Sequence, residues 1–189
     1  MSNIANWLTM HIKNNVPNLT DLQLIKIKFG FECLLSEASK TIIYILLFAS
    51  LSLTKEFLTA FLFFSIIRVF AGGHHEETYW RCFLSSLLFL GSSIFLGISI
   101  IIPVYVKIAI IIFSIIIAYI FSPVDHPNKP VINQQRRKKL KHLSIFVVIL
   151  LGIIGIKMSE IYSNIALFTI LAESISLILG YIKKKYVYN

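Results

Sequence analysis

Side chains able to do chemistry are concentrated in one polar stretch of an otherwise apolar sequence. Between Arg68 and Cys82 lie two histidines, two glutamates and a second arginine. Ionisable side chains beside apolar segments are functional candidates by default, because charge is costly to hold near lipid. A solvated connecting loop is the plain alternative. Three kinds of chemistry compete for this stretch.

The first is nucleophilic catalysis by a cysteine and a histidine. His75 and Cys82 are seven residues apart, which on one unbroken helix corresponds to about 10.5 Å of rise. That separation exceeds the hydrogen-bond distance of about 3 Å which the pair requires, so the chain must break between them. Thr78 is suited to that break as the N-cap of a helix that starts at Tyr79.

Other neighbours of Cys82 favour the same chemistry. Cys82 would lie in the first turn of the new helix, where the helix dipole and the adjacent Arg81 stabilise a thiolate. His75 would lie upstream of the cap, where the chain can fold back over the helix end. Gly72 and Gly73 permit the tight turn that this requires.

The second chemistry is metal binding by His74, His75, Glu76, Glu77 and Cys82. Four consecutive residues cannot all point at one ion, and a catalytic zinc takes its three protein ligands from well-separated positions. We therefore predict no metal site in this stretch.

The third chemistry is that of the intramembrane glutamate proteases which process CAAX proteins. Glu76, Glu77 and Arg81 match their E-E-x-x-x-R motif. That family also needs F-x-x-x-H and H-x-x-x-N motifs on later helices. His126 and His142 are the histidines further along the chain, and neither has the partner residue at that spacing. The match is therefore confined to one motif.

Two polar residues outside this stretch are left open. Cys33 is expected to be a small buried apolar residue, and two cysteines are too few for a disulfide framework. Glu173 lies deep in the last apolar segment. It either pairs with another polar side chain or has a functional role.

The composition indicates what kind of scaffold positions these residues. The chain of 189 residues is 57% hydrophobic and 14% charged, with a mean hydropathy of +0.79. Charged residues make up about a quarter of a typical soluble domain. One core of this size cannot hide so much apolar surface, so part of it must face lipid. The sequence predicts an all-α, polytopic membrane helical bundle that forms a single membrane domain over residues 1–189.

Residues 1–40 are expected to form N-terminal cytoplasmic or interfacial helices. Residues 3–16 have apolar side chains at helical spacing, which is typical of an amphipathic helix on the membrane surface. A capping box at Thr20 and Gln23 predicts the start of a second helix, which runs toward Lys40. No cleavable signal peptide is expected.

About six transmembrane segments follow, four within residues 41–121 and two within residues 143–189. We expect them at residues 41–54, 57–70, 83–102, 104–121, 143–159 and 161–182. The first two are short, at about 14 residues or about 21 Å of helix. They either extend into flanking polar residues, cross a locally thinned membrane or form a re-entrant hairpin.

Basic residues indicate the orientation of these segments. The net charge of +9 comes largely from clusters that flank apolar segments, which is typical of cytoplasmic loops and argues against nucleic acid as a partner. Segments on the same side of the membrane must be separated by an even number of crossings, and four crossings precede the basic loop while two follow it. We therefore expect four parts of the chain in the cytoplasm: the N-terminus, the loop 68–82, the basic loop 122–142 and the C-terminus. The basic loop either anchors this topology at the lipid surface or captures an acidic substrate segment.

The polar stretch also matches a known motif. Its pattern R68-x-x-A-G-G-x-H75-x6-C82 resembles the signature of the accessory gene regulator B family. The order of segments also resembles that family: an amphipathic N-terminus, about six membrane segments, and a basic loop before the last hairpin. The resemblance covers nearly the whole chain. Members of that family are bacterial membrane cysteine endopeptidases that cut the C-terminal part from a small peptide precursor. They then help to close the remainder into a thiolactone or lactone quorum-sensing signal.

The resemblance implies a site and a set of partners. Cys82 would be the nucleophile and His75 the general base, with Arg68, Gly72 and Gly73 as supporting residues of the motif. The substrate would be an amphipathic peptide precursor, and no cofactor would be needed. The enzyme would lie among the lipids of a bacterial cell membrane as a homodimer.

Part of the motif has no assigned role. His74 occupies its variable position, and no residue matches a third catalytic group that would orient His75. Two other functional classes also remain open. A small transporter would need polar residues along several spans, and a structural scaffold would not need the cysteine and histidine at all.

Overall fold

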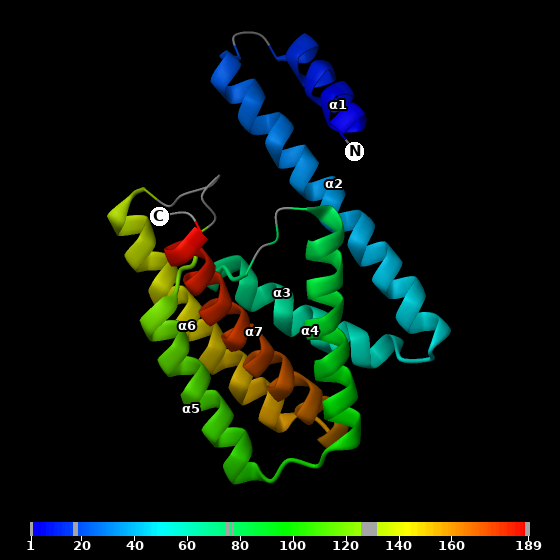
Figure 1. The fold of residues 1–189 in the computed structure, drawn as a ribbon, viewed down its shortest axis with the longest axis vertical. Coiled ribbons are helices and arrows are strands. Elements are labelled where there is room, and N and C mark those ends of the chain that lie inside the picture. The colour runs from blue at the N-terminus through cyan, green and yellow to red at the C-terminus, as the bar shows by residue number, and fades with distance from the viewer. Residues whose placement is uncertain (1, 17–18, 75, 77, 126–131, 188–189) are drawn as a thin grey trace. The chain divides into compact units, whose positions relative to one another are not determined.

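The structure is a computed structural model, and it describes residues 2–16, 19–74, 76, 78–125 and 132–187. These residues form seven α-helices and no strand (Figure 1). The helices are α1 (Ser2–Asn15), α2 (Asp21–Ser50), α3 (Thr54–Ala71), α4 (Tyr79–Ser99), α5 (Val104–Phe121), α6 (Gln134–Lys157) and α7 (Glu160–Val187). The all-α fold expected from the composition is confirmed.

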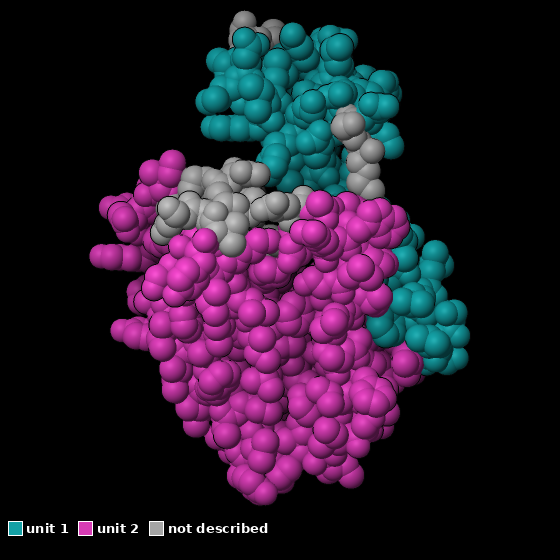
Figure 2. All heavy atoms as spheres, viewed as in Figure 1, with its two compact units in different colours: residues 1–52 teal, residues 53–189 magenta. Residues whose placement is uncertain are grey.

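The chain divides into two compact units, residues 1–52 and residues 53–189 (Figure 2). The first contains α1 and α2, and the second contains α3 to α7. A single membrane domain over the whole chain stays a prediction.

In the first unit, α2 is longer than expected. The capping box is present, since the Gln23 N–H donates to Thr20 Oγ1 at 3.3 Å and the Thr20 N–H donates to Gln23 Oε1 at 2.8 Å. From there α2 continues for 30 residues without a break. The expected segment 41–54 is therefore not a separate element, and the alternative that it extends into flanking polar residues is confirmed. No glycine or proline follows Gly30 in this helix, so the polar residues before position 41 extend the apolar segment as one helix.

Within the described residues, five helices are long and apolar enough to cross a membrane, namely α2, α4, α5, α6 and α7. The remaining expected segment, 57–70, forms α3, which has 18 residues but carries Lys55, Glu56 and Arg68. These three charged residues distinguish it from the helices that are apolar enough to cross a membrane.

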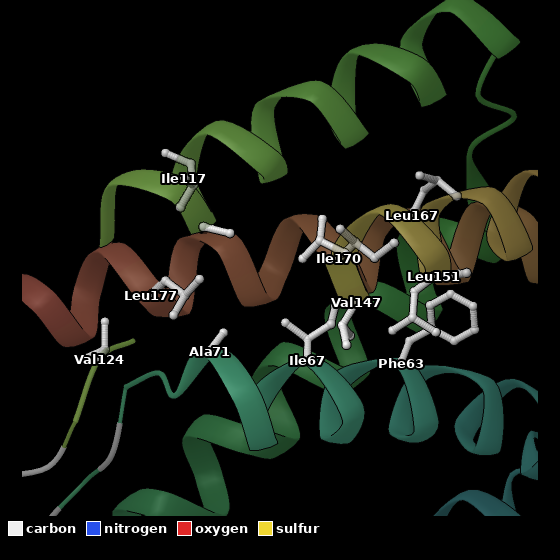
Figure 3. Close-up of a cluster of buried hydrophobic side chains, with 13 residues drawn as sticks. Phe63, Ile67, Ala71, Ile117, Val124, Val147, Leu151, Leu167, Ile170 and Leu177 are labelled. Carbon is white, nitrogen blue, oxygen red and sulfur yellow. The ribbon is translucent and has the colours of Figure 1, made fainter. Parts of the chain in front are cut away.

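Helix α7 lies at the centre of the second unit and packs against α3, α4, α5 and α6 (Figure 1). Figure 3 shows Phe63, Ile67 and Ala71 of α3 directed at α7, whose Ile170 and Leu177 belong to the same buried cluster. The outer faces of the surrounding helices instead expose large apolar side chains, for example Leu88 and Phe95 of α4 and Ile112 and Ile116 of α5. So much exposed apolar surface is typical of helices that face lipid.

The connections around the polar stretch meet at one end of this unit. After α3 the chain touches the segment after α5, where the Val124 N–H donates to the Ala71 carbonyl at 2.9 Å. Asp125 accepts hydrogen bonds from Arg137 of α6 and Lys184 of α7. The loop 68–82, the start of α6 and the end of α7 therefore share one end of the bundle. Which side of the membrane that end faces stays a prediction.

The basic run Arg136–Lys139 is helical, although it was expected in the loop 122–142. Asn133 caps α6, because its Oδ1 accepts from the N–H groups of Gln135 at 2.9 Å and Arg136 at 3.2 Å. This local cap starts the helix before the basic run.

Candidate active site

Cys82 lies in the first turn of α4, as the sequence predicts. Thr78 is the N-cap, and its Oγ1 accepts from the Arg81 N–H at 3.4 Å. The Cys82 N–H donates to the Thr78 carbonyl at 3.0 Å, which is the first backbone hydrogen bond of the helix. The Cys82 side chain is half-buried and Arg81 is exposed. The expected start of the helix at Tyr79 is therefore confirmed.

Neither cysteine is in a disulfide. Cys33 is exposed on α2, so the expectation that it is buried is wrong. It lies on a face of α2 that other side chains of the first unit leave uncovered.

His75 and Glu77 lie outside the described residues, and so does His126. The distance between His75 and Cys82 therefore stays a prediction. The residues on both sides of position 75 are described, and their contacts show how this part of the loop is held. Among the described residues, no three histidine, cysteine, aspartate or glutamate side chains group as metal ligands.

The two glycines of the motif have close neighbours. Gly72 has a φ of +76°, and a Cβ there would lie 1.9 Å from the Val124 carbonyl oxygen. Gly73 has a φ of +150°, and a Cβ there would lie 2.9 Å from Glu173 Oε1 and from Ser176 Oγ. The glycines thus permit both the turn and the close approach of the backbone to its neighbours.

Arg68 points into the bundle and connects α3 to α7. Its Nη1 donates to Ser176 Oγ at 3.3 Å and lies 3.5 Å from Glu173 Oε2. Its Nη2 donates to the His74 carbonyl oxygen. The guanidinium carbon lies 5.0 Å from the centre of the Phe64 ring, which shields it on one side. The motif arginine thus holds the loop through a backbone carbonyl.

The loop is also bound directly to α7. The His74 N–H donates to Ser176 Oγ at 3.0 Å. Gly180 lies under the loop, since a Cβ there would come within 3.0 Å of the Gly73 carbonyl oxygen and of the His74 nitrogen. The backbone of Gly73 and His74 therefore lies directly on the surface of α7.

Glu76 forms a second attachment to α7. Its carboxylate lies 2.7 Å from His74 Nε2 and accepts from Lys183 Nζ at 3.1 Å. The hydrogen bond with His74, followed by the bond to and charge of Lys183, holds the pKa of Glu76 below its usual value, although burial opposes this. Glu76 is therefore ionised at neutral pH and stays paired with Lys183.

Some of these residues were not found from the sequence. The alternative that Glu173 pairs with another polar side chain is confirmed by its contact with Arg68. Ser176, Gly180 and Lys183 were missed. They follow Glu173 at intervals of three, seven and ten residues, which is the spacing of one helix face. This helical spacing from Glu173 was the feature of the sequence that could have identified them.

The basic residues near the start of α6 border a pocket of about 310 Å³ at the same end of the bundle. Its lining includes Arg137, Lys138, Lys141 and Lys184 together with Phe121 and Tyr181. Arg137 and Lys184 also contact Asp125. The pocket has an excess of positive charge and aromatic walls.

Comparison with known proteins gives a result independent of this geometry. An AgrB-like protein of Clostridium beijerinckii is 28% identical over 145 residues, which cover 76% of this chain and 73% of that protein. Accessory gene regulator protein B of Staphylococcus aureus (strain bovine RF122 / ET3-1) is 25% identical over 162 residues, which cover 85% of this chain and 86% of that protein. Its namesake in Staphylococcus carnosus (strain TM300) is 27% identical, with 84% and 82% covered.

No solved structure matches the chain significantly. A family model does match, and it is described as Accessory gene regulator B. The match extends over residues 2–177, which include the whole polar stretch and most of α7. The chain therefore belongs to the accessory gene regulator B family.

Proposed function

We propose that this chain is a membrane cysteine endopeptidase that removes the C-terminal part of a small amphipathic peptide precursor and promotes closure of the remainder into a thiolactone or lactone. Membership of the accessory gene regulator B family implies a part in accessory gene regulator signalling, a quorum-sensing system. One observation carries the finer proposal. Cys82 lies in the first turn of α4, directly after the loop that contains His75.

The position of Cys82 supports a nucleophilic role. The N-terminus of a helix favours negative charge, and the thiolate is the reactive form of cysteine. The half-buried side chain leaves access for a peptide. The preceding loop is attached to α7 on both sides of position 75, as a loop that carries a catalytic base requires.

In the proposed reaction, His75 accepts the proton of the Cys82 thiol while the sulfur attacks the carbonyl carbon of the scissile peptide bond. The tetrahedral intermediate collapses when the leaving nitrogen takes this proton from His75. A thioester then joins Cys82 to the N-terminal part of the precursor. A thiol or hydroxyl group of the precursor next attacks the thioester and closes the ring, while its proton passes through His75 to the departing Cys82 sulfur.

The energetics favour a thioester over direct hydrolysis. Making a thioester from a peptide bond is uphill, whereas exchange of one thioester for another is nearly balanced. Water attack would release the stored free energy as a carboxylate, and ring closure would then need another energy source. The site must therefore exclude water, which a position at the end of an apolar bundle favours. Removal of the cut C-terminal fragment draws the reaction forward.

The same proposal includes the partners of the enzyme. The precursor lies on the lipid surface of a bacterial cell membrane, and its acidic part binds the pocket lined by Lys138 and Lys141 on the cytoplasmic side. Two copies of the chain form a homodimer. The pocket supports this binding because its positive charge complements an acidic segment.

Cleavage of a tagged precursor, co-expressed with each variant and followed on immunoblots, tests the central assignment. Cys82→Ala and Cys82→Ser should abolish cleavage, because both remove the nucleophile. Cys33→Ala is the matched control and should cleave normally, since Cys33 belongs to the other compact unit. Equal loss in the Cys33 and Cys82 variants would contradict the proposal.

A further inference from the structure

We propose that Glu173 and Ser176 of α7 are positioning residues of the peptidase site, which act through Arg68 to fix the backbone that carries His75. This inference rests on the proposed function. It assigns a role to two buried polar side chains that lie outside the polar stretch of the sequence.

Glu173 is a carboxyl side chain at a fully buried position, where a polar group needs partners. It is 0% exposed, and the Arg68 side chain that pairs with it is 17% exposed. Burial of such a pair costs free energy that its mutual attraction does not fully offset. Its Oε1 has no hydrogen-bond partner among the described residues, yet it lies against Gly73. The carboxyl group is therefore directed at the loop.

Both backbone polar groups of His74 are held by this cluster. Ser176 Oγ accepts from the His74 N–H at 3.0 Å, and Arg68 Nη2 donates to the His74 carbonyl. The carbonyl belongs to the same planar peptide unit as the nitrogen of residue 75. Arg68 thus orients the peptide plane that leads into the catalytic histidine, and Glu173 and Ser176 hold Arg68.

The chain is held again directly after position 75. Glu76 contacts Lys183 at 3.1 Å, and Lys183 lies on the same face of α7 as Glu173 and Ser176. The neighbours on both sides of His75 are therefore attached to one face of a rigid helix. A general base must stay within hydrogen-bond reach of its proton donor. Attachment of His74 and Glu76 to this face of α7 limits movement of the backbone between them.

This role predicts a specific kinetic signature. Displacement of a catalytic group by about 1 Å can cost about 100-fold in rate, so loss of the attachment should lower kcat. KM should change little, because Glu173 and Ser176 are buried beneath the loop. A pair needed only for folding would instead reduce the amount of folded protein and leave kcat per folded molecule unchanged.

Ser176→Ala against Ser174→Ala is the matched comparison. Both hydroxyls are buried on α7, but Ser174 Oγ donates to the Ile170 carbonyl of its own helix at 2.9 Å. With purified full-length enzyme in nanodiscs and synthetic precursor, Ser176→Ala should lower kcat by about tenfold to 100-fold with KM within about twofold. Ser174→Ala should match the unmodified enzyme.

Glu173→Gln tests the carboxyl member of the cluster and should lower kcat to a similar extent. Glu160→Gln is its control, because Glu160 is an exposed residue in the first turn of α7, far along the helix from the loop before α4. If Glu173→Gln fails to fold, Ser176→Ala still decides, since it removes a neutral hydroxyl. The pH profile of Cys82 alkylation should shift in both variants, without any precursor present.

The outcomes separate this inference from the proposed function. Unchanged kcat in the Ser176 and Glu173 variants of an enzyme that requires Cys82 would overturn the inference alone. So would an equal loss in Ser174→Ala, or a lower yield of folded protein at unchanged kcat. Cleavage that persists in Cys82→Ala would overturn the proposed function and this inference with it.

Discussion

His74 and His75 are adjacent, but the contacts of residue 74 indicate a different role. The His74 side chain lies 2.7 Å from Glu76, and its attachment to α7 is made by backbone atoms. Alanine keeps those backbone atoms. His74→Ala should therefore retain substantial cleavage, whereas His75→Ala should lose about 100-fold or more, the range for a missing general base.

Cleavage rates of the tagged precursor with each variant would measure this difference. Asn and Gln at position 75 provide further controls, because they keep a polar side chain that cannot act as a base at neutral pH. The opposite ranking, with His74→Ala inactive and His75→Ala active, would show that the base is His74.

The Arg68–Glu173 contact shows the limit of prediction for single residues. The motif identified Arg68, and Glu173 was noticed as a charge within an apolar segment. Their pairing joins positions 105 residues apart, so it depends on how α3 packs against α7. The residues next to Arg68 or Glu173 in the sequence do not indicate how these two helices pack. Ser176 is one of several serines in the chain, and its position under the loop alone distinguishes it.

At the scale of elements, local capping residues predict where helices begin. Thr20 and Thr78 were identified as N-caps from sequence, and both accept the expected backbone hydrogen bonds. The sequence does not predict the start of α6 at Asn133, because the proline and basic residues around it are typical of a loop. The length of α2 agrees with one of three alternatives, extension into flanking polar residues. The sequence does not choose between them, because hydropathy changes along a helix that has no local stop signal.

Gly72 ends α3 and should tolerate no side chain. Its φ of +76° is unfavourable for alanine, and a Cβ would lie 1.9 Å from the Val124 carbonyl oxygen. Gly72→Ala should lower the free energy of unfolding by about 1–3 kcal/mol from the backbone conformation alone, with further loss from the clash. Thermal unfolding of the purified protein in detergent would measure this, together with precursor cleavage.

Gly91→Ala is the control for that experiment. Gly91 lies within α4, and nothing lies within 4 Å of a Cβ built there. Alanine in a helix is favoured over glycine by about 1 kcal/mol, so this variant should be as stable as the parent protein or more stable. Destabilisation by Gly91→Ala that equals that of Gly72→Ala would argue against a special role for the turn.

At the scale of the whole molecule, the loop before α4 and the start of α6 share one end of the second unit, and the connection from α6 to α7 lies at the other end (Figure 1). The positive charge at the shared end predicts that it is cytoplasmic. In a background without native cysteines, Arg81→Cys and Gln135→Cys should react with an impermeant maleimide only after lysis. Ser159→Cys, in the opposite connection, should react in intact cells.

All three positions are exposed in the structure, so lack of labelling cannot be attributed to burial within the protein. Labelling of Arg81→Cys or Gln135→Cys in intact cells, at the level of Ser159→Cys, would refute the orientation. The sequence predicted the grouping of these ends by counting crossings and charges. The side chains that join them, Glu76 with Lys183 and Asp125 with Lys184, appear only in the folded protein.

Mass spectrometry of the intact enzyme, after brief incubation with a precursor that lacks its ring-closing side chain, tests the acyl-enzyme mechanism most directly. Without that side chain the second step is blocked, so the acyl group should accumulate on Cys82. We predict an added mass equal to the N-terminal part of the precursor, located on Cys82 and removed by hydroxylamine. Release of the free linear acid at early times, with no adduct on Cys82, would contradict it.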